Sequence, residues 1–581
     1  MQKLKYLFVF LLSTYLFSGN AQVDYDKIPQ VTSTYVLENA TIYQTADRVI
    51  QKGSILIEDG IIKEVGASVK IPAYAEVIKA DSMFVYAAFV DALSHTGVPK
   101  ADDKKERPKV RFPGLVSDEI AGITPGTNVR ASFSSKDKSI TDLQKAGFAV
   151  SHIVPRGKMM PGYGSVILLS SDPDKDVFLK ENSSLFAQFA PASGVSPATF
   201  IGIIAKWREY YKNAERKSSY LTKYKSSPAG MPRPNISKAE EALIPVVKKQ
   251  IPVFFVTPKH KTIARAIALQ KELGFDMVLT DVQQGFHSNK KIKAGRYPLL
   301  LSLDLPEDKR EKDKKDKEEE MNPDSAKDDK KEKEKEEEKK LDPEIEALKI
   351  KKEASLDLYL GQAAAYEKDG IPFAFTMLNS KSGDVKKNVA KMIEHGLSEK
   401  AALNALTVNA AKVIGVDNLV GTVERGKLAN IIITDKPYFD EKSSIRYLFV
   451  EGEKIEYEKK EEKKKKAKDG EMVDIAGTWD YTVSMFGGEE TGKSVITGSG
   501  DDLKISIYSA DEPNEAEEAY DITRENNLIS FSLDVDTDGG PMTLNMSLEF
   551  APSTYEGTVS VGEMGSFPMT GNRVGDPKSK F

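Results

Sequence analysis

The chain of 581 residues contains no cysteine. This excludes disulfides, cysteine metal ligands, thiol catalysis and an N-terminal lipid-bearing cysteine. The formal net charge is only -5 at pH 7, whereas a general nucleic-acid-binding protein shows a strongly basic face. The sequence also lacks a phosphate-binding glycine-rich loop and a Gly-x-Ser-x-Gly nucleophile motif. We therefore expect no nucleic-acid partner.

Apolar runs long enough to cross a bilayer, which takes ~20 residues, are also missing. One shorter run, Tyr6 to Phe17, follows Lys3 and Lys5 and precedes small residues that end at Ala21. This arrangement is typical of a secretory signal peptide, residues 1–21, cleaved after Ala21. The alternative, a membrane anchor, is disfavoured because the run is too short. We predict a secreted or periplasmic protein with no membrane span and no cysteine-linked lipid.

Charged residues make up 29% of the chain and gather in two runs. Residues 307–340 consist almost entirely of Lys, Glu and Asp, which cannot bury a core, so we interpret them as a surface insertion. Residues 458–470 have the composition of a linker. Neither run is expected to form a dedicated binding site.

The remaining sequence divides by its hydrophobic pattern. Alternating segments with Asp-Gly and Glu-Gly turns predict short paired strands on both sides of a central region. In that region apolar strands alternate with helical periodicity, which indicates a parallel barrel. The last segment alternates throughout, and Trp479 loosely resembles the first strand of lipocalin-like barrels, where we expect it in the core. The prediction is an α/β fold: a (β/α)8 TIM-like barrel (88–415), a discontinuous small β-sandwich domain (30–87 and 416–457) and a C-terminal all-β domain (471–581).

The stretch from Met83 to Gly97 organises the predicted barrel. It is an apolar strand that runs into a polar turn containing Asp91, Ser94 and His95. The C-terminal ends of barrel strands carry the chemistry in folds of this kind. We therefore expect a pocket at this turn.

Several segments resemble the metal-dependent amidohydrolase superfamily, and most closely its imidazolonepropionase-like and dipeptidase-like members. The strongest is GLSEKAALNALTVNAAKVIGV, in which we predict one helix over Leu397 to Val416 with Ser398 as its N-cap. GTVERGKLANIII, the segment Val154 to Leu169, which resembles a loop of the family, and the Asp91 strand end add to it. The resemblance covers roughly Thr34 to Tyr457. It implies an amidohydrolase barrel that hydrolyses C–N bonds of non-peptide or cyclic amides. Zn or another divalent metal would activate the attacking water.

The same resemblance implies that the metal ligands are mostly missing. A hydrocarbon side chain has no electron pair for a cation, and a metal enzyme needs about three protein ligands. We therefore predict no metal cofactor and a degenerate site, with Asp91, His95 and Asp281 as candidate pocket residues. Compared with the family pattern, Asp91 and His95 match, Leu93 replaces a histidine, Val256 and Pro258 replace a His-x-His pair, Asp281 replaces a histidine, Leu378 lies near the base aspartate, and Gln188 lies near the bridging carboxylate.

The other histidines are predicted to have mainly structural roles. His152 lies inside a strand, as a core histidine does, and His395 ends a helix, where the dipole favours it. His260 and His287 follow strand ends and could turn inward, but no pair has ligand spacing.

Three functions remain open. The first is a non-catalytic amidohydrolase-fold protein that serves as the partner of an intact relative. Such a protein could also form oligomers. The second is an active hydrolase that uses His95 and Asp281 as base and orienting acid without the usual metal. The third is an envelope protein that binds a small amide or peptide.

Overall fold

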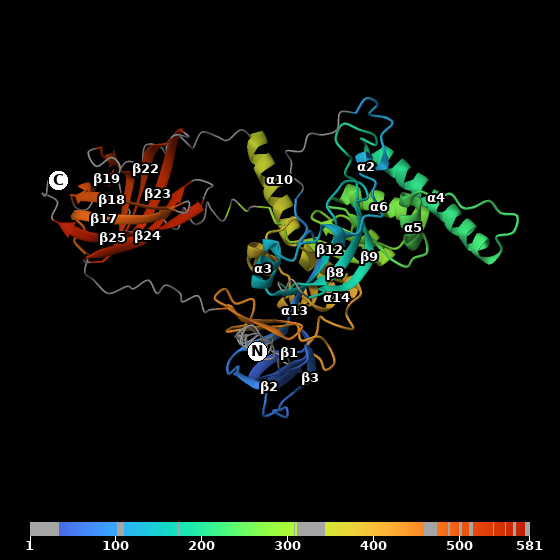
Figure 1. The fold of residues 1–581 in the computed structure, drawn as a ribbon, viewed down its shortest axis with the longest axis horizontal. Helices are drawn as coiled ribbons and strands as arrows, with labels where there is room; N and C mark the ends of the chain where they lie inside the picture. The colour runs from blue at the N-terminus through green and yellow to red at the C-terminus, as the bar shows by residue number, and fades with distance from the viewer. Residues whose placement is uncertain are drawn as a thin grey trace, which may run out of the picture. The chain divides into compact units, whose positions relative to one another are not determined.

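The computed structural model describes residues 34–100, 110–170, 175–306, 308, 310, 343–457, 473–485, 488–498, 502–510, 515–537, 540–551, 553–561 and 565–575. The predicted signal peptide, nearly all of the charged insertion and the linker 458–470 lie outside these residues. The chain divides into two compact units, residues 1–459 and 460–581 (Figure 1). No helix in the described ranges is long and apolar enough to cross a membrane.

The first unit contains an eight-stranded sheet made from segments far apart in the sequence. Strand β5 pairs with β14, with Ala87 opposite Ile431. The β2–β3 hairpin turns at Asp59 and Gly60, whose φ values of 51° and 75° explain the Asp-Gly signal. The strands are β1 (Tyr35–Tyr43), β2 (Val49–Glu58), β3 (Ile61–Gly66), β4 (Glu76–Lys79), β5 (Phe84–Ala87), β14 (Ile431–Thr434), β15 (Ile445–Val450) and β16 (Glu453–Glu456).

A second eight-stranded sheet follows the order β13-β12-β11-β10-β9-β8-β7-β6. Its two ends meet, because the backbone N–H of Met377 and the hydroxyl of Thr376 both donate to the Leu93 carbonyl, at 3.0 and 2.6 Å. The sheet therefore closes into the predicted barrel. Its strands are β6 (Phe89–Ser94), β7 (Phe148–Ile153), β8 (Gly162–Leu168), β9 (Phe178–Gln188), β10 (Val253–Val256), β11 (Met277–Val282), β12 (Leu299–Ser302) and β13 (Phe373–Thr376).

One barrel strand departs from regular strand–helix alternation. Strand β8 runs antiparallel to both β7 and β9, and no helix intervenes among the three. The sequence resemblance treated Val154 to Leu169 as a loop. The structure corrects this, since most of β8 is buried and apolar.

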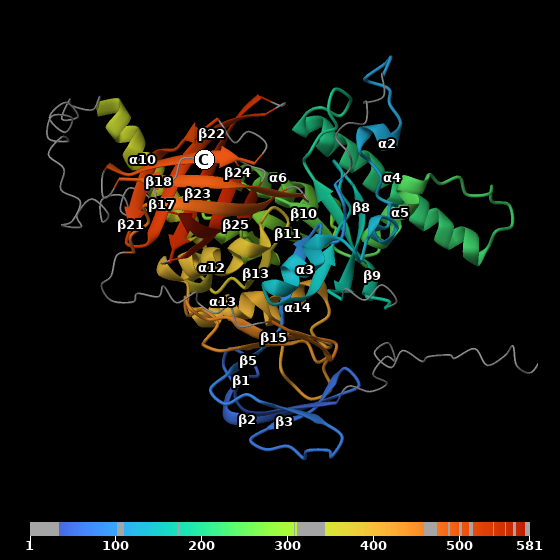
Figure 2. The ribbon, with the colours of Figure 1, turned by 60° about the vertical axis from the view of Figure 1, so that its left-hand side comes forward.

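Helices surround the barrel sheet, as the turned view shows (Figure 2). The segment Leu397 to Val416, predicted as one helix, is two helices that break at Thr407, where φ is -124° and ψ is -91°. Ser398 caps the first of them, as predicted, by accepting from the Ala401 N–H at 3.1 Å. The helices are α2 (Asp118–Ala121), α3 (Lys138–Lys145), α4 (Phe200–Ser226), α5 (Lys238–Val247), α6 (His260–Leu273), α7 (Asn289–Gly295), α10 (Pro343–Leu360), α11 (Gln362–Lys368), α12 (Val385–Glu394), α13 (Glu399–Leu406) and α14 (Val408–Ile414), with 3-10 turns at Val129–Ser132 and Ser382–Asp384.

The second unit is an antiparallel sheet in the order β20-β19-β18-β17-β25-β24-β23-β22-β21. Only Ala519 separates β20 from β21 in the chain, so the sheet closes around its core. Trp479 lies in that core, fully buried, and donates to the Ile475 carbonyl at 3.0 Å. The strands are β17 (Gly477–Met485), β18 (Gly488–Thr497), β19 (Lys504–Ser509), β20 (Glu517–Glu518), β21 (Tyr520–Glu525), β22 (Leu528–Thr537), β23 (Gly540–Phe550), β24 (Thr554–Val561) and β25 (Gly565–Gly575).

Candidate functional site

A cavity of about 350 Å³ opens at the C-terminal ends of β6 and β13, which we call the rim cavity. This is the end of a barrel where function is found. The turn after β6, helix α3, the turn after β7 and the loop after β13 all contribute to its wall. Its lining includes His95, Asp142, Arg156, Leu378 and Ser380.

His95 lines the rim cavity with a fixed ring. Its Nδ1 lies 2.8 Å from the Val154 carbonyl. A carbonyl oxygen can only accept a hydrogen bond, so Nδ1 carries the hydrogen and Nε2 is left as an acceptor. The ring also meets Phe186 edge-on, with centroids 5.9 Å apart. Burial, together with the smaller effect of the Arg156 charge, lowers the pKa of His95 to about 4, against the raising effect of the Val154 hydrogen bond. The imidazole is therefore neutral at pH 7.

Asp91 lies beneath the cavity wall and joins three strands. Its carboxylate accepts from the Ser151 hydroxyl on β7 at 2.6 Å and from the backbone N–H groups of Leu93 and Met377 at 3.2 and 3.1 Å. Burial raises its pKa, while these hydrogen bonds act in the opposite direction. Asp91 is fully buried, so the arrangement stabilises the barrel seam between β6 and β13.

Asp281 ends β11 with a backbone φ of 53°, in the left-handed region that Asp tolerates better than most residues. One carboxylate oxygen accepts from the Asn379 amide at 2.7 Å. The other is buried without a hydrogen-bond partner among the described residues. Burial raises the pKa of Asp281, opposed by hydrogen bonds from Ser302 and Asn379.

The three predicted pocket residues thus occupy different surroundings. His95 lines the rim cavity, whereas Asp91 and Asp281 are absent from its described lining. Asp281 reaches the same region only through Asn379, the neighbour of the cavity residue Ser380. The structure therefore does not bring His95 and Asp281 into one cavity.

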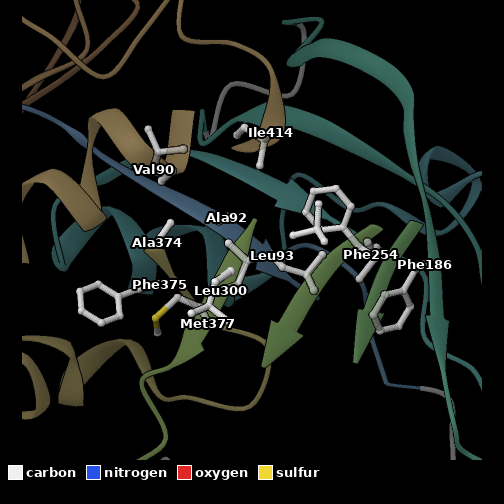
Figure 3. Close-up of a cluster of buried hydrophobic side chains, with 14 of the residues drawn as sticks. Val90, Ala92, Leu93, Phe186, Phe254, Leu300, Ala374, Phe375, Met377 and Ile414 are labelled. Carbon is white, nitrogen blue, oxygen red and sulfur yellow. The ribbon is translucent and has the colours of Figure 1, made fainter. Parts of the chain in front are cut away.

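The strand end where the family has its first histidine is filled by hydrocarbon. Leu93 is fully buried and belongs to one cluster with Phe186, Phe254, Leu300 and Met377 (Figure 3). We call this cluster the plug. Side chains packed in this way leave no lone pairs directed at a cation.

The other replaced positions offer no ligand set either. Val256 and Pro258 are half-buried, and the Gln188 amide donates to the Gly157 carbonyl at 2.8 Å. No group of three or more His, Asp or Glu side chains positioned for a metal occurs in the described part of the chain. The residues present therefore do not fit the metal centre that the family implies.

The remaining histidines were only partly anticipated. His152 is buried in β7 and bonded to the Ala92 carbonyl and the Ser184 hydroxyl, as expected of a core histidine. His395 ends α12 and contacts the Lys391 carbonyl at 2.8 Å. His260 and His287 do come together, with ring centroids 5.8 Å apart, but both are exposed at the barrel surface.

Three residues of the rim cavity escaped sequence analysis. Asp142 lies on α3, Arg156 follows β7, and Ser380 follows β13. None belongs to a recognisable motif, and their meeting depends on the closure of the barrel. The one usable signal was the position of Arg156 and Ser380 shortly after predicted strand ends.

Comparison with known proteins supports the fold. Residues 306–461 match the model of the amidohydrolase family. An amidohydrolase from Thermotoga maritima MSB8 has a TM-score of 0.56 and 21% identity, over 72% of this chain and 99% of that chain. A prolidase complexed with N-methylphosphonate-L-proline has a TM-score of 0.42 and 13% identity, over 73% and 100%, too low a score to add support. No curated protein matches the sequence.

The barrel, its flanking sheet and the solved amidohydrolase structure define an amidohydrolase-type fold. The amidohydrolase family model matches this chain over residues 306–461. The resemblance inferred from the sequence is thereby confirmed by the fold and by the family-model match over residues 306–461. The narrower imidazolonepropionase-like grouping stays a prediction.

Proposed function

We propose that this chain is a secreted amidohydrolase-fold protein that does not catalyse metal-dependent hydrolysis and serves as the non-catalytic partner of an intact relative. The observation that carries the proposal is the plug. Where the family needs an imidazole, Leu93 is fully buried among apolar side chains. A retained scaffold with hydrocarbon at a ligand position fits a binding or structural role better than a metal hydrolase.

Metal analysis of the full mature chain tests the catalytic part. The protein is purified, incubated with zinc or manganese, desalted and measured for bound metal and for hydrolysis of cyclic amides and N-acylated amino acids. We expect far less than one metal per chain and no hydrolysis above buffer. Stoichiometric metal together with metal-dependent turnover would overturn the proposal.

The partner role has a separate test. We expect the mature chain to co-elute with an intact amidohydrolase from the same genome when the two are co-expressed, and to change that enzyme's stability or rate. Separate elution, with unchanged enzyme properties, would contradict it. Secretion is tested by sequencing the N-terminus of protein recovered from outside the cytoplasm, where we expect Gln22 first.

A second candidate is a hydrolase that uses His95 as a metal-free base. It is favoured by the position of His95 on the rim cavity, where Nε2 has no hydrogen-bond partner among the described residues and the low pKa keeps the ring neutral. If this is correct, His95→Ala abolishes an activity that chelators leave intact. An activity unchanged in His95→Ala would eliminate this candidate.

A further inference from the structure

The rim cavity contains unpaired charges of both signs. Lys100 and Arg156 bring positive charge to its wall, and Asp137 and Asp142 bring negative charge. Within the described residues, no ion pair joins any of the four to another side chain. Asp137 is already engaged, since its carboxylate caps α3 through the Ser139 N–H at 2.9 Å. In the part of the chain that the structure describes, the Asp142 carboxylate makes no such contact.

Arg156 is fixed by one hydrogen bond and has further N–H donors available for a ligand. Its Nε donates to the Val98 carbonyl at 2.9 Å, which fixes the plane of the guanidinium. The two terminal amino groups have no partner among the described residues. Partial burial lowers the pKa of Arg156, offset by the Asp137 charge, yet a guanidinium stays charged in proteins. A carboxylate satisfies two such donors at once, in the bidentate geometry that Arg favours.

The cavity also has a spare hydroxyl and an apolar wall. The Ser380 hydroxyl is buried and has no hydrogen-bond partner among the described residues. Leu143, Met377 and Leu378 line the same cavity. The cavity volume lies at the lower end of the range typical of small-molecule sites, about 300–1,000 Å³. A ligand that fits this lining and volume is therefore small, with charges of both signs and a short aliphatic group.

We propose that the rim cavity binds a small zwitterion of the α-amino acid type. Its carboxylate pairs with Arg156, its ammonium with Asp142, and its aliphatic side chain lies against Leu143 and Leu378. A simple anion is less suitable, because it would leave the Asp142 carboxylate unpaired beside it. The proposal goes beyond the non-catalytic role and gives the binding hypothesis a definite place. It requires neither a metal nor a reaction.

Calorimetric titration of the full mature chain tests this site. The probes are L-leucine, N-acetyl-L-leucine, which lacks the ammonium, and L-leucinamide, which lacks the carboxylate. L-leucyl-glycine separates a free amino acid from a peptide, since its two charges lie further apart. We expect L-leucine to bind, and each one-charge analogue to bind roughly tenfold more weakly or worse.

Two variants assign the charges individually. Asp142→Asn is expected to weaken leucine binding roughly tenfold and to remove the discrimination against N-acetyl-L-leucine. Arg156→Gln is expected to do the same for L-leucinamide. Lys145→Gln is the matched control, because it changes charge on the same helix outside the cavity, and we expect no effect. Circular dichroism of each variant checks that it is folded.

Three results would overturn the proposal. They are no heat from any zwitterion at millimolar concentration, equal binding of leucine and N-acetyl-L-leucine, and loss of binding in Lys145→Gln to the same extent as in Asp142→Asn. Preference for L-leucyl-glycine over leucine would reassign the ligand to peptides. Each outcome is independent of the metal and hydrolysis measurements, so failure here leaves the proposed function standing.

Discussion

The packing of Leu93 in the plug allows the effect of its truncation on the free energy of unfolding to be predicted. Its side chain is fully buried at the seam of the barrel. Truncation to alanine loses the transfer free energy of the removed carbons and leaves a cavity, which together cost about 2–5 kcal/mol in packed cores. We expect Leu93→Ala to lower the free energy of unfolding of the barrel by that amount. Leu93→His adds a buried polar ring with no partner, so we expect a loss at least as large.

Leu378→Ala is the matched control. Leu378 also follows a barrel strand end, but it is half-buried and borders the rim cavity. Surface substitutions of this kind change the free energy of unfolding by about 0.5 kcal/mol or less, and partial burial brings the expected loss to roughly 1 kcal/mol. The measured quantity is therefore the difference in free energy of unfolding between Leu93→Ala and Leu378→Ala.

Urea unfolding followed by tryptophan fluorescence provides the assay. The chain has two tryptophans, Trp207 in the first unit and Trp479 in the second, so a Trp479→Phe background leaves Trp207 as the reporter. Trp207 is fully buried and lies against Phe255 and Phe275, with ring centroids 5.6 Å away in both cases. Because this reporter lies in the first unit alone, the unfolding of the two units is not fitted as a single transition.

Two outcomes would contradict the prediction for Leu93. The first is a Leu93→His protein as stable as its parent, which would mean that this strand end faces water. The second is a Leu93→His protein that acquires stoichiometric zinc and a higher unfolding midpoint, which would mean that the neighbouring residues already form most of a metal site.

Two further predictions concern buried titratable groups. Burial lowers the pKa of His152 to about 4, below its unfolded value, so the unfolded chain binds the extra proton. The contribution of neutral His152 to the free energy of unfolding is fully present above about pH 6.5 and is lost as pH falls toward 4, by about 2 kcal/mol per such histidine at pH 5. We expect His152→Asn to reduce the pH dependence of the free energy measured by urea unfolding. An unchanged pH dependence would exclude His152 as its origin. Asp281→Asn removes a buried charge and keeps a residue that tolerates positive φ, so we expect a stabilisation of roughly 1 kcal/mol. A destabilised variant that also loses a measured hydrolysis would instead support the metal-free enzyme.

The sequence allowed prediction where a local pattern carries the information. Alternation and the Asp59–Gly60 turn gave the hairpins, and Ser398 marked a helix start. Strand β8 escaped because its own residues Gly162 and Gly164 look like loop residues in isolation. The break at Thr407 escaped because the residues on both sides form helices readily.

The candidate site was less accessible to sequence reasoning. The substitution at Leu93 was readable because a family pattern surrounds it. Asp142, Arg156 and Ser380 follow no pattern, and only the closure of β6 against β13 brings them to one cavity. Whether a buried carboxylate receives hydrogen bonds also depends on donors that are distant in the sequence, as the contrast between Asp91 and Asp281 illustrates.

The pairing of β5 with β14 has a consequence for biosynthesis. Ala87 cannot meet Ile431 until the ribosome has added a further stretch of about 340 residues, which takes roughly 20–70 s at ordinary elongation rates. During that interval the nascent β5 edge has open backbone donors and acceptors, a template for aggregation. A holding chaperone, or delayed folding until translation is complete, would protect newborn chains of this protein.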